Sequence, residues 1–195
     1  MSRNYSVTVD VRALRSLRAR LDKLSPASMA RVQKRAIGTV RRRVGPVAAQ
    51  LLGEDLNLPK SKIRNRLRVD GGPDYVAIHG SSVGIPLAEF GATWGGPKSR
   101  GVVAKVFRDA APRTYAGSFI ARTSGKKAAV YERAWRGGRR TGKRYGRLPV
   151  QHVRGPNVGS LLIATGPHQV AGRLIAFASQ VLASELSRLL DIEER

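Results

Sequence analysis

Two short segments carry residue types and spacings that catalysis could use, and the first is Gly80–Gly84, which reads Gly-Ser-Ser-Val-Gly. It matches the G-x-S-x-G pattern in which a hydrolase holds its nucleophilic serine on a strained turn from a strand into a helix. Here Ile85-Pro86 follows instead of a helix start. None of the three histidines has an obvious carboxylate partner along the chain: His79, His152 and His168. We therefore interpret the segment as a turn between a strand and a loop.

The second segment, Gly137–Lys143, nearly matches the phosphate-binding loop of nucleotide-binding proteins. That loop needs Ser or Thr directly after its lysine to bind magnesium, and then a helix. This chain has Arg144 at that position, and Tyr145-Gly146-Arg147 is a poor helix start. We interpret residues 136–147 as a basic, glycine-rich loop between two strands.

Cysteines and carboxylates, the other usual carriers of catalysis and metal binding, predict no site. The chain has no cysteine, which excludes disulfides, thiol catalysis and zinc–cysteine sites. Its acidic residues are scattered, and the adjacent residues Glu54-Asp55 lie near a predicted helix end. A metal nuclease needs several carboxylates that converge. We therefore expect no enzyme activity, no catalytic residues, no metal and no cofactor.

The strongest signal in the composition is charge. Against 13 Asp and Glu stand 36 Lys and Arg, which gives the 195 residues a formal net charge of +23. The excess lies in two basic zones, residues 1–70 and 98–154, which flank a near-neutral segment. A compact protein of this charge repels itself, so we expect a polyanionic partner, an acidic protein surface, or both. The alternative is that a GC-rich genome favours arginine codons.

Nothing along the chain predicts a membrane or secretory segment. No apolar run approaches the roughly 20 residues of a membrane-spanning helix. The polar residues Met1–Asp10 lack the apolar centre of a signal peptide. We expect a protein that is made in the cytoplasm and has no membrane partner.

The N-terminal part of the chain is predicted to be mainly helical. Tyr5–Val11 alternates like a short strand, and Ala13–Leu24 carries leucines on one helical face. Ser25-Pro26 is then an N-cap signal for one long amphipathic helix that extends to Leu52. Gly45-Pro46 lies inside its apolar stripe, so we expect a kink rather than an end.

The rest of the chain is predicted to be short strands and turns before a second long helix over Pro167–Leu190. A helical turn is expected from Leu58 to Leu67, a half-turn over Ile85–Phe90, loops over 91–101 and 109–115, and strands over 75–79, 102–107, 118–122, 127–135 and 148–153. This order predicts an α+β fold, with an antiparallel sheet packed by a long kinked N-terminal helix and a long C-terminal helix, and with extended basic loops. The length predicts a single domain over 1–195, with an N-terminal arm over 1–24.

Several of these segments form an ordered set along the chain. They are the Arg- and Ala-rich helix Ala27–Leu52, the Leu-Pro-initiated basic helix Leu58–Arg68, and the segments Ile85–Gly91, Tyr115–Ala121, Val130–Arg133, Arg147–Val150 and Gly155–Val158. In this order they resemble the phage minor tail protein Z family of tail-completion proteins, over most of residues 27–163. The chain departs from the family pattern at Tyr131, where Phe is expected, at Asn157, where Ser is expected, and in a longer insertion over 136–146.

The resemblance implies a structural virion protein in the neck, at the head-proximal end of a phage tail. It would be needed for head–tail joining and DNA passage. It implies partners of three kinds: other copies of the chain in a ring that could be a hexamer, neighbouring tail terminator, tail tube or neck proteins, and viral DNA.

Two basic clusters are the predicted contacts to acidic surfaces or phosphates: Arg41, Arg42, Arg43, Arg139, Arg140, Lys143, Arg144 and Arg147. For the arginine triplet, the alternative is a solvated helix face. The loops 91–101 and 136–147 are predicted to reach neighbouring subunits through Trp94, Lys98, Arg100 and Trp135. A stand-alone, non-specific nucleic-acid-binding protein is the alternative function, although the aromatic residues are dispersed and no helix-turn-helix or zinc finger is visible.

Overall fold

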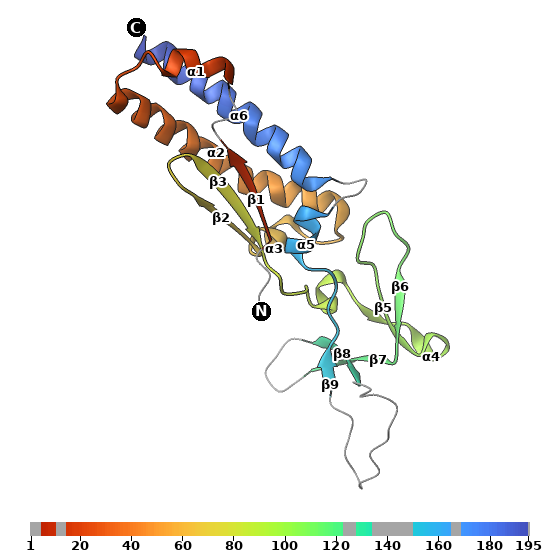
Figure 1. Cartoon of the computed structure of the whole chain (residues 1–195). Helices are drawn as coiled ribbons and strands as arrows, with labels where there is room; N and C mark the ends of the chain where they lie inside the picture. Colours follow the sequence, from red (N-terminus) through yellow and green to blue (C-terminus); the bar gives the residue numbers. More distant parts are fainter. Residues whose placement is uncertain (1–4, 11–14, 123–127, 134–149, 165–168, 195) are drawn as a thin grey trace. The chain divides into compact units, whose positions relative to one another are not determined.

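The fold is known from a computed structural model that describes residues 5–10, 15–122, 128–133, 150–164 and 169–194 (Figure 1). It confirms the α+β class and the two long helices. The contacts of the chain divide it into two compact units. The large unit comprises the described residues within 1–54, 59–83 and 157–195, and the small unit those within 55–58 and 84–156.

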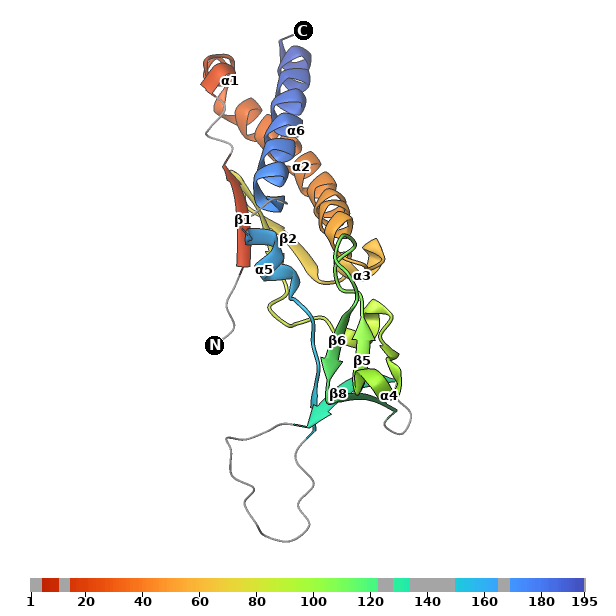
Figure 2. The ribbon, with the colours of Figure 1, turned by 90° about the vertical axis from the view of Figure 1, so that its right-hand side faces the viewer.

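The large unit combines helices with one three-stranded antiparallel sheet in the order β1-β3-β2. Its elements are β1 (Tyr5–Asp10), α1 (Arg15–Leu21), α2 (Pro26–Asp55), α3 (Lys60–Arg64), β2 (Leu67–Gly71), β3 (Tyr75–Gly80), α5 (Val158–Ile163) and α6 (Val170–Glu193). The ribbon turned by 90° shows the two long helices crossing one another (Figure 2).

The sequence signal for the start of α2 acts as predicted. The Ser25 hydroxyl accepts the Ser28 N–H at 3.2 Å, and the Ser25 carbonyl accepts the Met29 N–H at 2.9 Å, so Ser25 is the N-cap. The helix continues through Pro46, which is exposed. Its buried stripe consists of small and aliphatic residues at helical spacing: Val32, Ala36, Val40, Val44, Ala48 and Leu52.

A double ion pair fastens α1 to the end of α6. The Arg20 guanidinium lies 2.7 Å from a carboxylate oxygen of Asp191 and 2.7 Å from one of Glu194. Hydrogen bonding to Glu194, and then to Asp191, raises the pKa of Arg20, and the bond from Arg20 lowers the pKa of Glu194. Carboxylates are unfavourable at the negative end of a helix dipole, so Arg20 offsets their charge there.

The small unit is built from strands. Its elements are η2 (Leu87–Phe90), β4 (Thr93–Trp94), α4 (Gly96–Ser99), β5 (Gly101–Ala104), β6 (Arg113–Ala116), β7 (Ser118–Ala121), β8 (Ala129–Arg133) and β9 (Val150–His152). They form two further antiparallel sheets, in the orders β4-β5-β6 and β7-β8-β9.

Several sequence predictions need correction. The strands pair in three small sheets rather than in one. The helical turn expected through Leu67 ends at Arg64, and Leu67 begins β2, which pairs with β3. The loop expected over 91–101 contains β4 and α4, and the loop expected over 109–115 contains most of β6. Within the described ranges, no helix has the length and apolar character needed to cross a membrane.

We predict that replacing Leu186 by Ala lowers the free energy of unfolding by about 2–5 kcal/mol, because the side chain is fully buried and the change leaves a cavity. Ile175→Ala is the matched control on the same helix, because Ile175 is 41% exposed, and its expected loss is below about 1 kcal/mol. Urea denaturation followed by circular dichroism measures both. Equal losses would show that α6 does not bury the Leu186 face.

Candidate polyanion-binding surface

The predicted triplet Arg41, Arg42 and Arg43 lies in the middle of α2, with all three residues exposed. Buried residues, Val40 and Val44, flank it on both sides. Successive helical residues are about 100° apart around the axis, so three consecutive side chains cannot share one face.

The three arginines accordingly meet different neighbours. Arg41 lies beside β2, where a β-carbon on Gly71 would be 3.7 Å from Arg41 Cδ. Arg42 faces α6 and donates to Thr39 Oγ1 at 3.2 Å. The charge of Arg43 helps to lower the pKa of Glu185 on α6. The triplet is therefore divided between the sheet side and the α6 side of α2.

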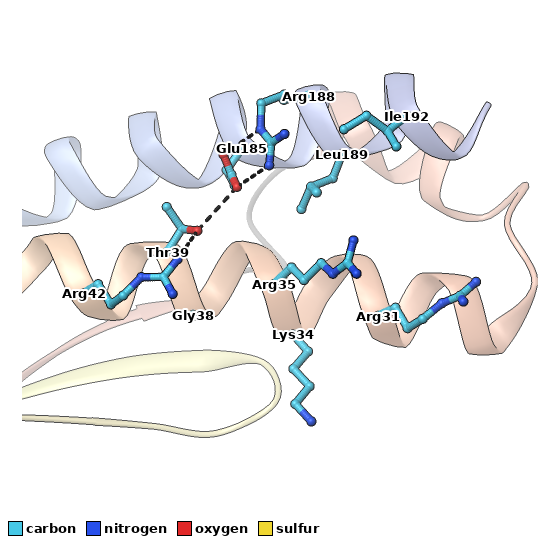
Figure 3. Close-up of a pocket in the computed structure, with 10 residues that line it drawn as sticks. All are labelled: Arg31, Lys34, Arg35, Gly38, Thr39, Arg42, Glu185, Arg188, Leu189 and Ile192. Carbon is cyan, nitrogen blue, oxygen red and sulfur yellow. Dashed lines mark hydrogen bonds and ion pairs between the residues drawn. The ribbon is translucent and has the colours of Figure 1, made fainter. Parts of the chain in front are cut away.

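On the α6 side, Arg42 borders a groove of about 560 Å³ between α2 and α6, which we call the α2–α6 groove (Figure 3). Leu189, Ile192 and Gly38 contribute apolar lining. Its cationic side chains come from both helices: Arg31, Lys34, Arg35, Arg42 and Arg188. This groove thus brings five cationic side chains from two helices to one hollow.

A chain of hydrogen bonds crosses the α2–α6 groove. Arg188 donates twice to the Glu185 carboxylate, at 3.1 and 2.8 Å. The Thr39 hydroxyl donates to Glu185 at 3.4 Å, and Arg42 in turn donates to that hydroxyl. One carboxylate is thus linked to two guanidinium groups. Hydrogen bonding by Arg188 is the main cause that holds the pKa of Glu185 below its ordinary value of 4.5.

Sequence reasoning found only part of this site. It singled out Arg42, but not Arg35 or Arg188, which line the same groove. The missing signal lies in the pairing of two distant segments, because residue 188 meets residues of α2 only through the helix–helix packing.

The second predicted cluster lies outside the described residues. It comprises Arg139, Arg140, Lys143, Arg144 and Arg147, together with Trp135. Their assignment as contacts stays a prediction.

The other predicted contact residues lie in and beside α4 of the small unit. Trp94 ends the short strand β4 and is 55% exposed. Lys98 is exposed in α4, and Arg100 follows it in a left-handed backbone conformation with φ 46°. The role of Trp94, Lys98 and Arg100 as contacts to a neighbouring subunit stays a prediction.

The segment Gly80–Gly84 does not form a nucleophile turn. Ser82 is followed by irregular chain and the short 3₁₀ helix η2, not by an α-helix. A β-carbon on Gly80 would be 2.6 Å from the Gly159 Cα of α5, so glycine permits this close backbone approach. The motif is explained by packing.

One expectation about the histidines is wrong. His79 Nε2 lies 3.4 Å from Asp70 Oδ2, and Arg68 donates to the other oxygen of the same carboxylate at 3.0 Å. These residues lie on the paired strands β2 and β3, which explains why spacing along the chain did not reveal them. Among the described residues, no group of three or more histidines and carboxylates could hold a metal ion.

The small unit has a hollow of its own, of about 370 Å³, lined in part by Arg113, Tyr115 and Arg154. The Arg113 guanidinium lies 5.7 Å from the centre of the Tyr115 ring, and Arg154 donates to the Gly84 carbonyl at 3.1 Å. Both cations therefore already have partners within the small unit.

Comparisons with known proteins give no relative: no family model, no curated protein and no solved structure matches the chain.

We predict that the stability that Glu185 gives to the large unit is lost in acid. Because its folded pKa is lowered, the carboxylate contributes stability above its unfolded pKa, and this contribution is lost as the pH falls through the folded value. In urea denaturation at a series of pH values, Glu185→Gln should be less stable than the native chain at pH 7, and the difference should shrink as the pH falls below 4.5, the ordinary pKa of a glutamate. Arg188→Gln should reduce the same pH dependence. A difference that persists unchanged in acid would contradict the ion pair.

Proposed function

We propose that this chain is a structural protein of a tailed bacteriophage virion. It acts as a tail-completion or neck component at the head-proximal end of the tail, where it serves head–tail joining and DNA passage. Other copies of the chain form a ring with it, and tail terminator, tail tube or neck proteins adjoin that ring. The support comes from the segments that resemble the minor tail protein Z family.

Two of these segments hold one another in place in the small unit. The Ile85 N–H donates to the Pro156 carbonyl at 3.1 Å, and the Gly155 N–H donates to the Ile85 carbonyl at 2.8 Å. A β-carbon on Gly155 would come 2.9 Å from the Phe90 ring. The Ile-Pro-Leu and Gly-Pro patterns thus belong to two segments that bond to one another. This supports the interpretation that they form one family signature.

The Tyr115–Ala121 segment has a structural reason too. Gly117 turns the chain from β6 to β7 with φ 73°, a conformation that favours glycine. Ser118 follows and is 2% exposed. Its hydroxyl donates to the Tyr115 carbonyl at 2.5 Å and accepts the Val102 N–H at 3.2 Å. Gly117 allows the turn and Ser118 bonds two backbone groups beside it, so both residues have a structural role at the corner between the two sheets.

At the two single-residue departures from the family pattern, the residue that is present makes contacts that the family residue could also make. The Tyr131 ring stacks on Phe119 with centroids 6.1 Å apart and lies 4.4 Å from the His152 ring, contacts that Phe could also make. Asn157 caps α5 by accepting the Ser160 N–H at 2.6 Å, and Ser is an equally good N-cap residue. These equivalences favour the resemblance.

The observation that carries the proposal is that the segments that resemble the family have structural roles. Where the structure describes them, the segments spread over residues 85–158 supply turns, a cap and ring stacking. A family whose signature is structural, in a chain with a net charge of +23, suits a component that works by assembly.

The proposal is tested in the phage that encodes the chain. Deleting the gene should leave DNA-filled heads and tails that do not join, and adding the purified protein to the extract should restore joined particles in electron micrographs. Mass spectrometry of purified virions should find the chain. Infectious, joined particles that form without the gene would refute the role, as would repeated absence of the chain from virions.

A contact with viral DNA predicts a specific salt response. Each phosphate contact releases counterions, so the affinity for duplex DNA should fall at least about tenfold between roughly 50 and 200 mM salt. Fluorescence anisotropy with a labelled duplex measures this. Exchanging Arg41, Arg42 and Arg43 together for Gln should flatten the salt dependence if the triplet contributes. Binding that is independent of salt would remove the phosphate contact from the proposal.

A further inference from the structure

The α2–α6 groove holds more positive charge than its own carboxylates neutralise. Five cationic side chains line it against the single carboxylate of Glu185. Arg188 already occupies that carboxylate with two hydrogen bonds. Outside the lining, Glu193 lies 3.6 Å from Arg31. In the part of the chain that the structure describes, Arg35 has no carboxylate within ion-pair distance, although Figure 3 shows its side chain between the two helices.

The same groove is apolar at one end. Ile192 lines it and is 53% exposed, and Leu189 beside it is buried against the helices. Figure 3 shows Leu189 pointing from α6 toward Arg35. Ile192 and Arg35, which has no carboxylate partner among the described residues, thus offer two kinds of binding energy in one hollow.

This combination favours a protein segment over DNA as the occupant. The sugar–phosphate backbone of a duplex offers no aliphatic side chain to Ile192. An acidic peptide offers carboxylates, which match the planar fork of an arginine, together with apolar side chains. Amphipathic peptide helices bind in grooves of this kind.

We propose that the α2–α6 groove binds an acidic segment of a neighbouring protein. Carboxylates of that segment pair with Arg35 and Arg42, and an apolar side chain packs on Leu189 and Ile192. This deepens the proposed assembly role and rests on it only for the identity of the neighbour.

Gly38 offers a way to block the groove without changing its charge. A β-carbon built on Gly38 meets no atom within 4 Å, so Gly38→Leu fills open space rather than creating a clash. Leucine also favours helix more than glycine does, which protects the fold. Arg35→Glu reverses a charge inside the groove. Arg41→Glu is the matched control, because Arg41 lies on the same helix beside β2 and does not line the groove.

The probe is a fluorescent synthetic helical peptide with glutamates on one face and leucines on the other, and its binding to the full chain is measured by anisotropy. Gly38→Leu and Arg35→Glu should each weaken binding at least about tenfold, as loss of a central contact does. Arg41→Glu should weaken it by less than about threefold, the screened effect of a distant surface charge. Equal effects of Arg35→Glu and Arg41→Glu would mean unspecific attraction and would overturn the proposal.

Two further measurements test the apolar contact and the class of occupant. Ile192→Ser should weaken binding of the leucine peptide, but not of a peptide with serines in place of the leucines. Affinity for duplex DNA should be unaffected by Gly38→Leu. If Gly38→Leu instead weakened DNA binding and spared the peptide, the occupant would be nucleic acid and the proposal would fall. These results stand apart from the virion tests, so each proposal can fail alone.

Discussion

The confinement of α2 between the sheet and α6 is the constraint on which the rest of the large unit depends. On one side a β-carbon on Gly45 would lie 3.2 Å from Val69 Cγ2 of β2, and on the other Thr39 reaches Glu185 of α6. Figure 3 shows α2 between α6 and the β2–β3 hairpin. A helix that packs on two sides has only narrow exposed strips, so its many cationic side chains lie together in these strips. The basic groove follows from this confinement.

The sequence predicted what depends on periodicity and local signals. Helical spacing located α2 and α6, and Ser25 located the start of α2, because an N-cap acts within one turn. The strands β4 and β6 were missed because they are two and four residues long and rich in polar or small side chains. Their existence depends on pairing with β5, a contact that no local pattern encodes.

For the candidate site, the sequence predicted which helix is basic, but not which neighbours its cationic side chains contact. Three adjacent arginines read as one cluster along the chain, whereas the helix places Arg41 and Arg42 on different sides. The partners that give Arg42 its setting, Thr39 and Glu185, become neighbours only when α6 packs on α2. The prediction of an anionic ligand rests on residue type, because charge does not depend on folding, and it stays a prediction.

The scarcity of aromatic residues in the interior has an optical consequence. Among the buried hydrophobic residues that the structure describes, Phe90 is the single aromatic, and the rest are aliphatic. Trp94 instead projects from β4 with more than half of its surface in water. In a chain with Trp135 replaced by Phe, the remaining indole emission would respond little to melting of the aliphatic interior. It would shift to the blue when another surface covers β4, so the chain carries its own unlabelled reporter of association.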